Sequence, residues 1–216
     1  MSTLQQSDEP LCRVAIVGGT FDPIHHGHLV AAEEARVQLG LDKIVIVPAR
    51  NQPMKGGNSA PPEQRFLMAV LATAQHPQIA VSREELDRPG RSYTIDTVRA
   101  FRGRLGSECE LFFLVGADAV LELPSWLEPD AILDECQFVA VHRPGYDLSQ
   151  LGARLGKDRA TKIMTLQIPQ LEISSTEIRE RVRKGMSIKY LVPEAVEAYI
   201  LKTGVYSDRN GGPDLG

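Results

Sequence analysis

The chain has 216 residues, of which 43% are hydrophobic and 24% charged, and its formal net charge at pH 7 is -4. These values exclude a wholly disordered or fibrous protein and suit one globular domain. The mild acidity argues against a basic nucleic-acid-binding module, although a local site on an acidic protein can still bind a small anion.

Short apolar runs alternate with amphipathic stretches along the chain. The apolar runs cover residues 14–17, 44–47, 111–115 and 138–141. Each run is uninterrupted, as expected of parallel strands that are buried on both faces. The stretches with helical spacing of apolar residues cover 28–39, 62–74, 94–105, 175–184 and 193–202. This alternation predicts an α/β fold, a Rossmann-like, doubly wound parallel sheet with helices on both faces.

We expect one domain over residues 12–206 with flexible tails at residues 1–11 and 207–216, because neither end has a periodic apolar face. Residues 51–61 are the one long loop-like segment inside it, and such loops are often functional. The first eleven residues lack the apolar centre of a signal peptide, and no run approaches the length of a membrane span. The sequence therefore predicts a cytoplasmic protein with neither a membrane nor a nucleic acid among its partners, and no pattern indicates an oligomeric state.

The three cysteines, Cys12, Cys109 and Cys136, lie far apart in the chain. An odd number of cysteines without a C-x-x-C pair is unlike a disulfide framework or a zinc knuckle. We therefore expect three reduced thiols, as is usual in the cytoplasm.

The strongest motif directly follows the first predicted strand and has the sequence GGTFDPIHHGH. Gly18 and Gly19 allow a ligand to approach the backbone closely, and the helix N-terminus that follows favours a phosphate. His25 and His28 are three residues apart at the start of this helix, so both can face the same ligand. The motif is neither G-x-G-x-x-G nor a P-loop, which disfavours a dehydrogenase and a P-loop nucleotidase.

A second helix N-terminus with hydroxyl side chains occurs near the other end of the chain. Ser174, Ser175 and Thr176 before Glu177 are typical of an N-cap with an acidic first turn. The same N-terminus can hold an anion, and Arg179, one turn further on, can clamp phosphate oxygens.

Three further positions have both a structural and a functional interpretation. Asp118, directly after the strand at 111–115, can accept hydrogen bonds from ribose hydroxyls or cap a helix. Trp126 is the only tryptophan, and such a residue is usually part of the core, although its ring also suits stacking on a ligand. Arg143 follows the strand at 138–141 and can complete the nucleotide pocket, although a turn is enough to explain the Pro-Gly that comes after it.

The motif GGTFDPIHxGH resembles the signature of the nucleotidylyltransferase superfamily. Together with the later segments ISSTEIR, SYTIDT and GAD followed by a tryptophan, the chain resembles the bacterial nicotinate-nucleotide adenylyltransferases from about residue 14 to residue 206. The resemblance implies adenylyl transfer from ATP to nicotinate mononucleotide, which gives nicotinate adenine dinucleotide and pyrophosphate in NAD biosynthesis. Mg²⁺ is expected with ATP, and no metal site made by the protein itself is expected.

The resemblance also implies roles for individual residues. His25 and His28 are expected to contact the phosphates in the transition state, and Arg179 the departing pyrophosphate. The residues implied in ATP binding are Gly18, Gly19, Thr20, Phe21, Lys55, Gly116, Asp118, Ile173, Ser174, Ser175 and Thr176. The residues implied in binding the nicotinate mononucleotide are Ser92, Tyr93, Thr94, Trp126 and Arg143.

The loop after the second predicted strand departs from the family pattern. The family often has P-P-H-K there, whereas this chain has Gln52, Pro53, Met54 and Lys55. Lys55 remains available for phosphate, but the role of the family histidine does not carry over to Met54.

Two other functions fit the same motifs. One is an adenylyl- or cytidylyltransferase that uses another phosphorylated acceptor, and the other is a non-catalytic adenine-nucleotide sensor on the same scaffold. A fragment of a tRNA synthetase shares H-x-G-H, but it should bring a larger chain with an anticodon-binding part.

Overall fold

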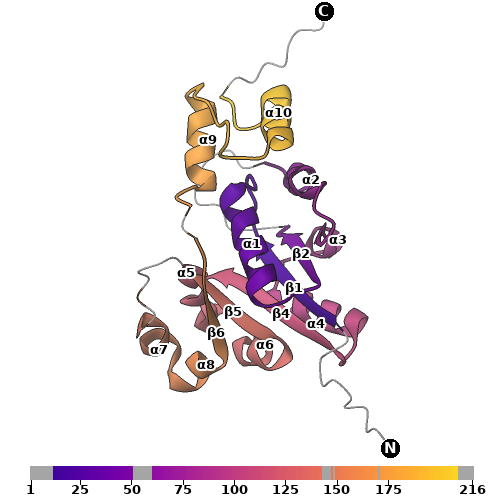
Figure 1. The fold of residues 1–216 in the computed structure, drawn as a ribbon, viewed down its shortest axis with the longest axis vertical. Coiled ribbons are helices and arrows are strands. Elements are labelled where there is room, and N and C mark those ends of the chain that lie inside the picture. The colour runs from indigo at the N-terminus through magenta and orange to yellow at the C-terminus, as the bar shows by residue number, and fades with distance from the viewer. Residues whose placement is uncertain (1–11, 51–59, 143–146, 148, 170, 209–216) are drawn as a thin grey trace, which may run out of the picture.

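The computed structural model describes residues 12–50, 60–142, 147, 149–169 and 171–208. Within these residues, six strands form one parallel sheet in the order β3-β2-β1-β4-β5-β6 (Figure 1). From β1 the chain first adds β2 and β3 on one side of the sheet, and it then adds β4, β5 and β6 on the other side. This order confirms the predicted doubly wound, Rossmann-like class.

The strands agree with the sequence prediction in the centre of the sheet and differ from it at both edges. They are β1 (Cys12–Gly19), β2 (Lys43–Pro48), β3 (Ile79–Val81), β4 (Cys109–Gly116), β5 (Gln137–His142) and β6 (Ile163–Gln167). The four predicted runs lie inside β1, β2, β4 and β5. The edge strand β3 is only three residues long, and in β6 only Ile163 and Leu166 are buried. Neither edge strand therefore has the uninterrupted apolar run that a strand buried on both faces requires.

The five predicted helices are all present, and the described residues also form shorter helices that the sequence did not predict. The former are α1 (His26–Gln38), α2 (Pro62–Thr73), α4 (Thr94–Leu105), α9 (Ser175–Arg183) and α10 (Glu194–Thr203). The latter are α3 (Glu84–Asp87), α5 (Ala117–Val120), the 3-10 helix η1 (Leu123–Ser125), α6 (Pro129–Glu135), α7 (Ser149–Leu155) and α8 (Lys157–Thr161). Each of these has seven residues or fewer, which is too short for helical periodicity to show.

Helices cover both faces of the sheet, as predicted, and each face has its own core. Ala15 of β1 packs in a cluster that includes Ile178 of α9, whereas the next residue, Ile16, packs in a second cluster with Ile95 of α4. The first cluster also takes residues of α1, α2 and α10, and the second those of α6 and α7. Figure 1 shows α9 and α10 together beyond one end of the sheet, where α10 packs against α2. The C-terminal helices thus reach the edge where β1 ends.

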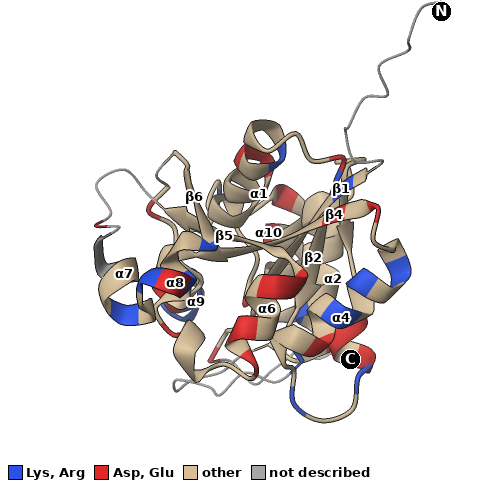
Figure 2. Ribbon diagram, turned by 90° about the horizontal axis from the view of Figure 1, so that it is seen from below, with Lys and Arg blue, Asp and Glu red and all other residues tan. Residues whose placement is uncertain are grey.

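Charged residues of both signs lie on the helices around the sheet, and the central strands are mostly uncharged (Figure 2). This is the distribution expected when helices shield a buried parallel sheet. Among the described residues, no helix is both long and apolar enough to cross a membrane. The predicted tails lie outside the described residues, apart from 207 and 208, so the prediction of one domain with two tails stays a prediction.

The prediction of three reduced thiols is wrong, because Cys12 and Cys109 form a disulfide. The two cysteines are 97 residues apart in sequence, but they face each other in the register of β1 and β4 with a Cα–Cα distance of 4.8 Å. Sequence spacing alone does not show which strands are neighbours. Cys136 is free and buried, and burial raises the pKa of its thiol to about 12.

Reduction of this disulfide should lower the stability of the chain. Opening a link between residues 97 apart frees a long loop in the unfolded state, and the loop-entropy model gives about 4.7 kcal/mol of lost stability for a loop of that length. Urea unfolding with and without dithiothreitol measures the difference. The Cys12→Ser/Cys109→Ser variant should not respond to the reductant. If the wild-type chain does not respond either, the two thiols are not linked in solution.

Candidate active site

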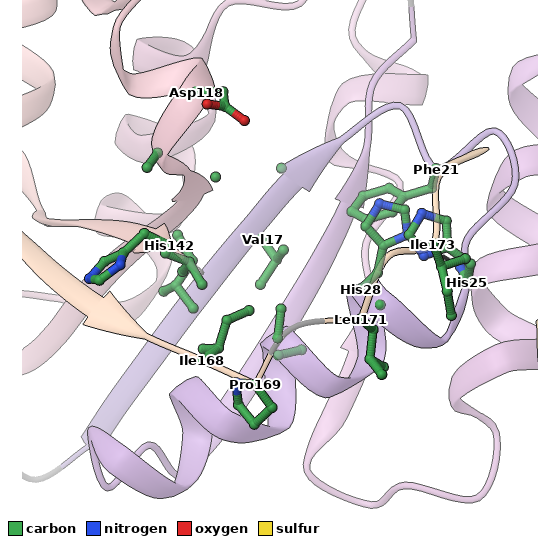
Figure 3. Close-up of a pocket in the computed structure, with 18 residues that line it drawn as sticks. Val17, Phe21, His25, His28, Asp118, His142, Ile168, Pro169, Leu171 and Ile173 are labelled. Atoms are coloured by element: carbon green, nitrogen blue, oxygen red, sulfur yellow. Dashed lines mark hydrogen bonds between the residues drawn. The ribbon is translucent and has the colours of Figure 1, made fainter. Parts of the chain in front are cut away.

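A pocket of about 420 Å³ lies beyond the carboxyl ends of β1, β4 and β5. In a doubly wound sheet this is the point where the strand order reverses, and ligands collect there. Figure 3 shows Phe21, His25 and His28 at one end of the pocket and Asp118 with His142 at the other. The predicted residues that line it are Gly18, Phe21, His25, His28, Gly116, Asp118 and Ile173.

The two histidines stack at the start of α1. His25 is the N-cap residue with an extended backbone, and its N–H donates to Nδ1 of His28 at 3.2 Å. The ring centroids are 3.7 Å apart, and the edge of Phe21 meets His28 at 5.1 Å between centroids. Gly27 makes this arrangement fit, because a Cβ there would lie 3.0 Å from the His25 ring. Both rings therefore face the pocket, as the spacing predicted.

Both rings are uncharged in the free protein at neutral pH. Burial lowers the pKa of His25 to about 3, with a smaller contribution from the neighbouring His28, and burial lowers the pKa of His28 to about 4. Because Nδ1 of His28 accepts a hydrogen bond, its proton is assigned to Nε2, which can donate to a ligand. A bound polyphosphate would in turn favour protonation of the pair.

Acid should therefore destabilise the free protein through this pair. The pKa of each ring is lower in the folded chain than its ordinary value of 6.5, so the unfolded chain binds more protons below that pH. Stability is fully present above about pH 6.5 and falls as the pH drops toward the folded pKa, by about 2 kcal/mol for one ring at pH 5. Urea midpoints at about pH 7.5 and pH 5 measure the loss. The His25→Asn/His28→Asn variant should lose less than the wild-type chain, and an equal loss would show that the two rings are not its cause.

Asp22, in the loop after β1, connects this loop to three distant parts of the chain. Its side chain is buried, and Oδ1 accepts hydrogen bonds from the Tyr206 hydroxyl at 2.7 Å and the Ala60 N–H at 3.0 Å. Its carbonyl oxygen accepts from Nη1 of Arg179 at 2.7 Å. Burial raises the pKa of Tyr206, and Asp22 raises it further, so the phenol stays protonated as the donor.

The N-terminus of α9 lies against the same loop. Ser174 is its N-cap, with Oγ accepting from the Glu177 N–H at 3.1 Å, as the sequence predicted. Ser175 donates to the carbonyl of Pro23 at 2.9 Å. Arg179 also donates to Thr176 at 3.2 Å, besides its bond to Asp22. The structure thus brings the two predicted helix N-termini together, although residues 174–176 and Arg179 lie beside the pocket rather than in its lining.

The remaining predicted residues are spread around the pocket. Asp118 is exposed in the lining, and Gly116 is the N-cap of α5, so the interpretation of Asp118 as that cap is wrong. Gly19 is the last residue of β1 and Thr20 begins the loop that follows it, and neither lines the pocket. Lys55 and Arg143 lie outside the described residues.

The segment predicted to bind the acceptor lies at the start of α4, away from the described pocket. Ser92 accepts a hydrogen bond from the Arg50 N–H at 3.3 Å, Tyr93 is the N-cap residue, and Thr94 begins the helix. Trp126 is half-buried, and its ring meets the Phe138 ring edge-on at 6.1 Å between centroids. None of these four residues lines the pocket in the part of the chain that the structure describes.

Sequence reasoning missed two buried polar side chains beside the site, Arg65 and Tyr206. Burial lowers the pKa of the Arg65 guanidinium, and the charge of Asp22 opposes that shift. Helical periodicity does not distinguish a buried arginine from one at the surface, and Tyr206 lies in a short C-terminal segment without periodicity. In the described ranges, no group of three or more His, Cys, Asp or Glu residues is arranged to hold a metal ion.

Comparisons with known proteins show the family to which this chain belongs. The family model "Cytidylyltransferase-like" matches residues 16–181, so the chain is of the nucleotidyltransferase class. A "Probable nicotinate-nucleotide adenylyltransferase" from Moorella thermoacetica is 48% identical over 204 residues, which cover 93% of this chain and 94% of that protein. One with the same name from Thermoanaerobacter sp. is 46% identical, covering 92% and 97%. The chain belongs to the bacterial nicotinate-nucleotide adenylyltransferase family, as the motifs predicted.

A solved structure supports the fold independently of sequence. The nicotinic acid mononucleotide adenylyltransferase of Plasmodium falciparum, complexed with NaAD, has a TM-score of 0.74 at 22% identity. The match covers 90% of this chain and 97% of that one. The architecture is therefore shared by proteins whose sequences differ widely.

Proposed function

We propose that this chain transfers the AMP part of ATP to nicotinate mononucleotide in the cytoplasm, giving nicotinate adenine dinucleotide and pyrophosphate for NAD biosynthesis. Membership of the family supports the reaction, and one observation about the site carries it. The stacked rings of His25 and His28 on α1, and α9 bound to the same loop through Ser175 and Arg179, put two helix N-termini side by side. Such a pair suits a triphosphate, because the positive ends of both helix dipoles favour anions.

The chemistry requires alignment rather than a strong base. The attacking group is a phosphate oxygen of the acceptor, which is already an anion, so the protein need not remove a proton. Catalysis then consists of holding attacker, α-phosphate and leaving group in line and stabilising the charge that develops. His25 and His28 are positioned to donate to the phosphates, with Nε2 of His28 as the donor that the structure leaves for this role.

Arg179 is proposed to bind the departing pyrophosphate. Its two hydrogen bonds, to Asp22 and Thr176, hold the guanidinium at the N-terminal turn of α9. A guanidinium has five N–H groups, so further donors remain for phosphate oxygens. Lys55 is proposed as a second contact to the same group.

Mg²⁺ is proposed to arrive with ATP, as part of the substrate. Among the described residues that line the pocket, Asp118 supplies the one carboxylate, whereas Mg²⁺ readily takes its ligands from phosphates and water. Gly18, Gly19, Thr20, Phe21, Gly116, Asp118, Ile173 and residues 174–176 are the proposed ATP-binding residues.

The acceptor is proposed to bind across the start of α4. A helix N-terminus with Ser92, Tyr93 and Thr94 favours the carboxylate of the nicotinate ring over a neutral amide. Trp126 and Arg143 are proposed to complete the acceptor site.

A panel of acceptors tests the function directly. The purified chain is supplied with Mg-ATP and one of nicotinate mononucleotide, nicotinamide mononucleotide or phosphopantetheine, and pyrophosphate release is measured. The fastest release is expected with nicotinate mononucleotide. A faster reaction with another acceptor would assign the chain to that substrate, and binding of ATP with no pyrophosphate from any acceptor would make it a sensor.

A further inference from the structure

Arg65 of α2 is a buried cation between the loops that follow β1 and β2. Its exposed fraction is 3%. The guanidinium donates to four backbone carbonyls, those of Thr20 at 2.6 Å, Ala49 at 2.7 Å, Ala60 at 3.1 Å and Arg50 at 3.2 Å. Burying a cation is costly unless it is well hydrogen-bonded, and these acceptors meet that condition. The buried charge is therefore accounted for by its hydrogen bonds to these backbone carbonyls rather than by apolar packing.

The four carbonyls belong to separate parts of the site. Thr20 lies in the glycine-containing loop that is proposed to bind ATP. Ala49 and Arg50 follow β2, and Ala60 lies two residues before the start of α2. Arg65 thus fixes the ATP-binding loop to the segment that follows the next strand.

Arg50 continues the connection to the acceptor segment. Its N–H donates to Ser92 at 3.3 Å. Its Nη1 donates to the carbonyls of Arg88 at 2.8 Å and Leu86 at 3.2 Å, on the approach to α4. A continuous series of hydrogen bonds therefore runs from Thr20 through Arg65 and Arg50 to Ser92.

We propose that Arg65 is a positioning residue for adenylyl transfer, which sets the place of the ATP-binding loop relative to the acceptor segment at Ser92. The inference rests on the proposed function, because it concerns how two bound substrates are aligned. An in-line attack is sensitive to such alignment, and a displacement of about 1 Å can lower the rate about 100-fold. Lysine cannot take the role, because one ammonium group does not span carbonyls that a planar guanidinium reaches on several sides.

The test compares Arg65→Lys with a matched control, Arg102→Lys. Arg102 also donates to backbone carbonyls, those of Cys109 at 2.7 Å, Glu135 at 3.0 Å and Gly106 at 3.2 Å, but it does so at the opposite end of β4 from the pocket. Three quantities are measured for each chain: kcat with saturating substrates, the Kd of a non-hydrolysable ATP analogue alone, and the thermal midpoint. For Arg65→Lys, kcat should fall at least about 10-fold while the Kd of the analogue stays within about 3-fold. Arg102→Lys should lower the thermal midpoint and leave kcat within about 3-fold.

Three results would overturn the inference. The first is a decrease in kcat of less than about 10-fold for Arg65→Lys, and the second is a weakening of analogue binding that matches the decrease in kcat. The third is an equal loss of kcat in Arg102→Lys, since Arg65 would then act only through general stability.

A second variant decides the question if Arg65→Lys does not fold. Arg50→Met removes the bonds to the carbonyls of Leu86 and Arg88 from a side chain that is only partly buried. The KM for nicotinate mononucleotide should rise at least about 5-fold while the Kd of the ATP analogue stays unchanged, and a smaller rise in KM overturns the inference. A wild-type chain that reacts only with another acceptor overturns the proposed function, and the same comparison is then made with that acceptor. A wild-type chain that reacts with none overturns both.

Discussion

Replacing His28 by alanine should lower kcat about 100-fold or more while the chain still folds. His28 lines the pocket, and its Nδ1 is occupied by the N–H of His25, so Nε2 is the atom that can donate to a phosphate. Alanine removes that donor at the point where charge develops in the transition state. The chain should still fold, because among the described residues the His28 side chain makes one hydrogen bond, at 3.2 Å, and its ring contacts are with His25 and Phe21 in the pocket lining. Steady-state pyrophosphate release gives kcat, and circular dichroism reports the fold.

His26→Ala is the matched control for this variant. His26 lies in the same turn of α1 but is not among the residues that line the pocket. Its kcat should stay within about 3-fold of the wild-type value. Unchanged turnover in His28→Ala would mean that this ring does not contact the reacting phosphates, and an equal loss in both variants would indicate damage to α1.

Replacing Arg179 by methionine should lower kcat/KM for ATP by about 100- to 1,000-fold. The guanidinium is held at the first turns of α9, beside the loop that carries His25, and it is proposed to stabilise the pyrophosphate that leaves. Arg179→Lys should have an intermediate effect, because lysine keeps the charge but does not reproduce the planar set of donors. In the reverse direction, the KM for pyrophosphate should rise.

Arg181→Met provides the comparison on the same helix. Arg181 pairs with Glu177 at 3.1 Å at the surface, away from the loop after β1, so its removal should change kcat/KM by no more than about 3-fold. Arg179 has a purely structural role if Arg179→Met lowers the thermal midpoint and leaves kcat/KM unchanged. The hydrogen bond from Arg179 to the carbonyl of Asp22 would then be its main contribution to stability.

Local patterns in the sequence were sufficient to predict the central strands and helices and to find the two phosphate motifs. The apolar runs at 14–17 and 111–115 predict strands because both faces of β1 and β4 are covered by helices. Ser174 as an N-cap is equally local, since its partner Glu177 is three residues away. The two motifs meet in the structure, where Ser175 of α9 donates to the carbonyl of Pro23 in the loop after β1.

The features that escaped prediction depend on contacts between distant segments. Cys12 and Cys109 are neighbours only because β1 and β4 pair in a particular register. The sequence of α2 does not show the functional setting of Arg65, because its acceptors lie in the loops after β1 and β2 and at Ala60, two residues before the helix. β6 lacks a continuous apolar run because it is an edge strand, and its place follows only from the pairing with β5.

The position of Asp22 has a consequence for the synthesis of the protein. Its loop is synthesised long before two of its hydrogen-bond partners, Arg179 and Tyr206, which lie 157 and 184 residues further along the chain. A nascent chain that stops before α9 can pair β1 with β4 but cannot complete the contacts that fix this loop. Nucleotide binding by the growing polypeptide should therefore begin only after α9 and Tyr206 have left the ribosome.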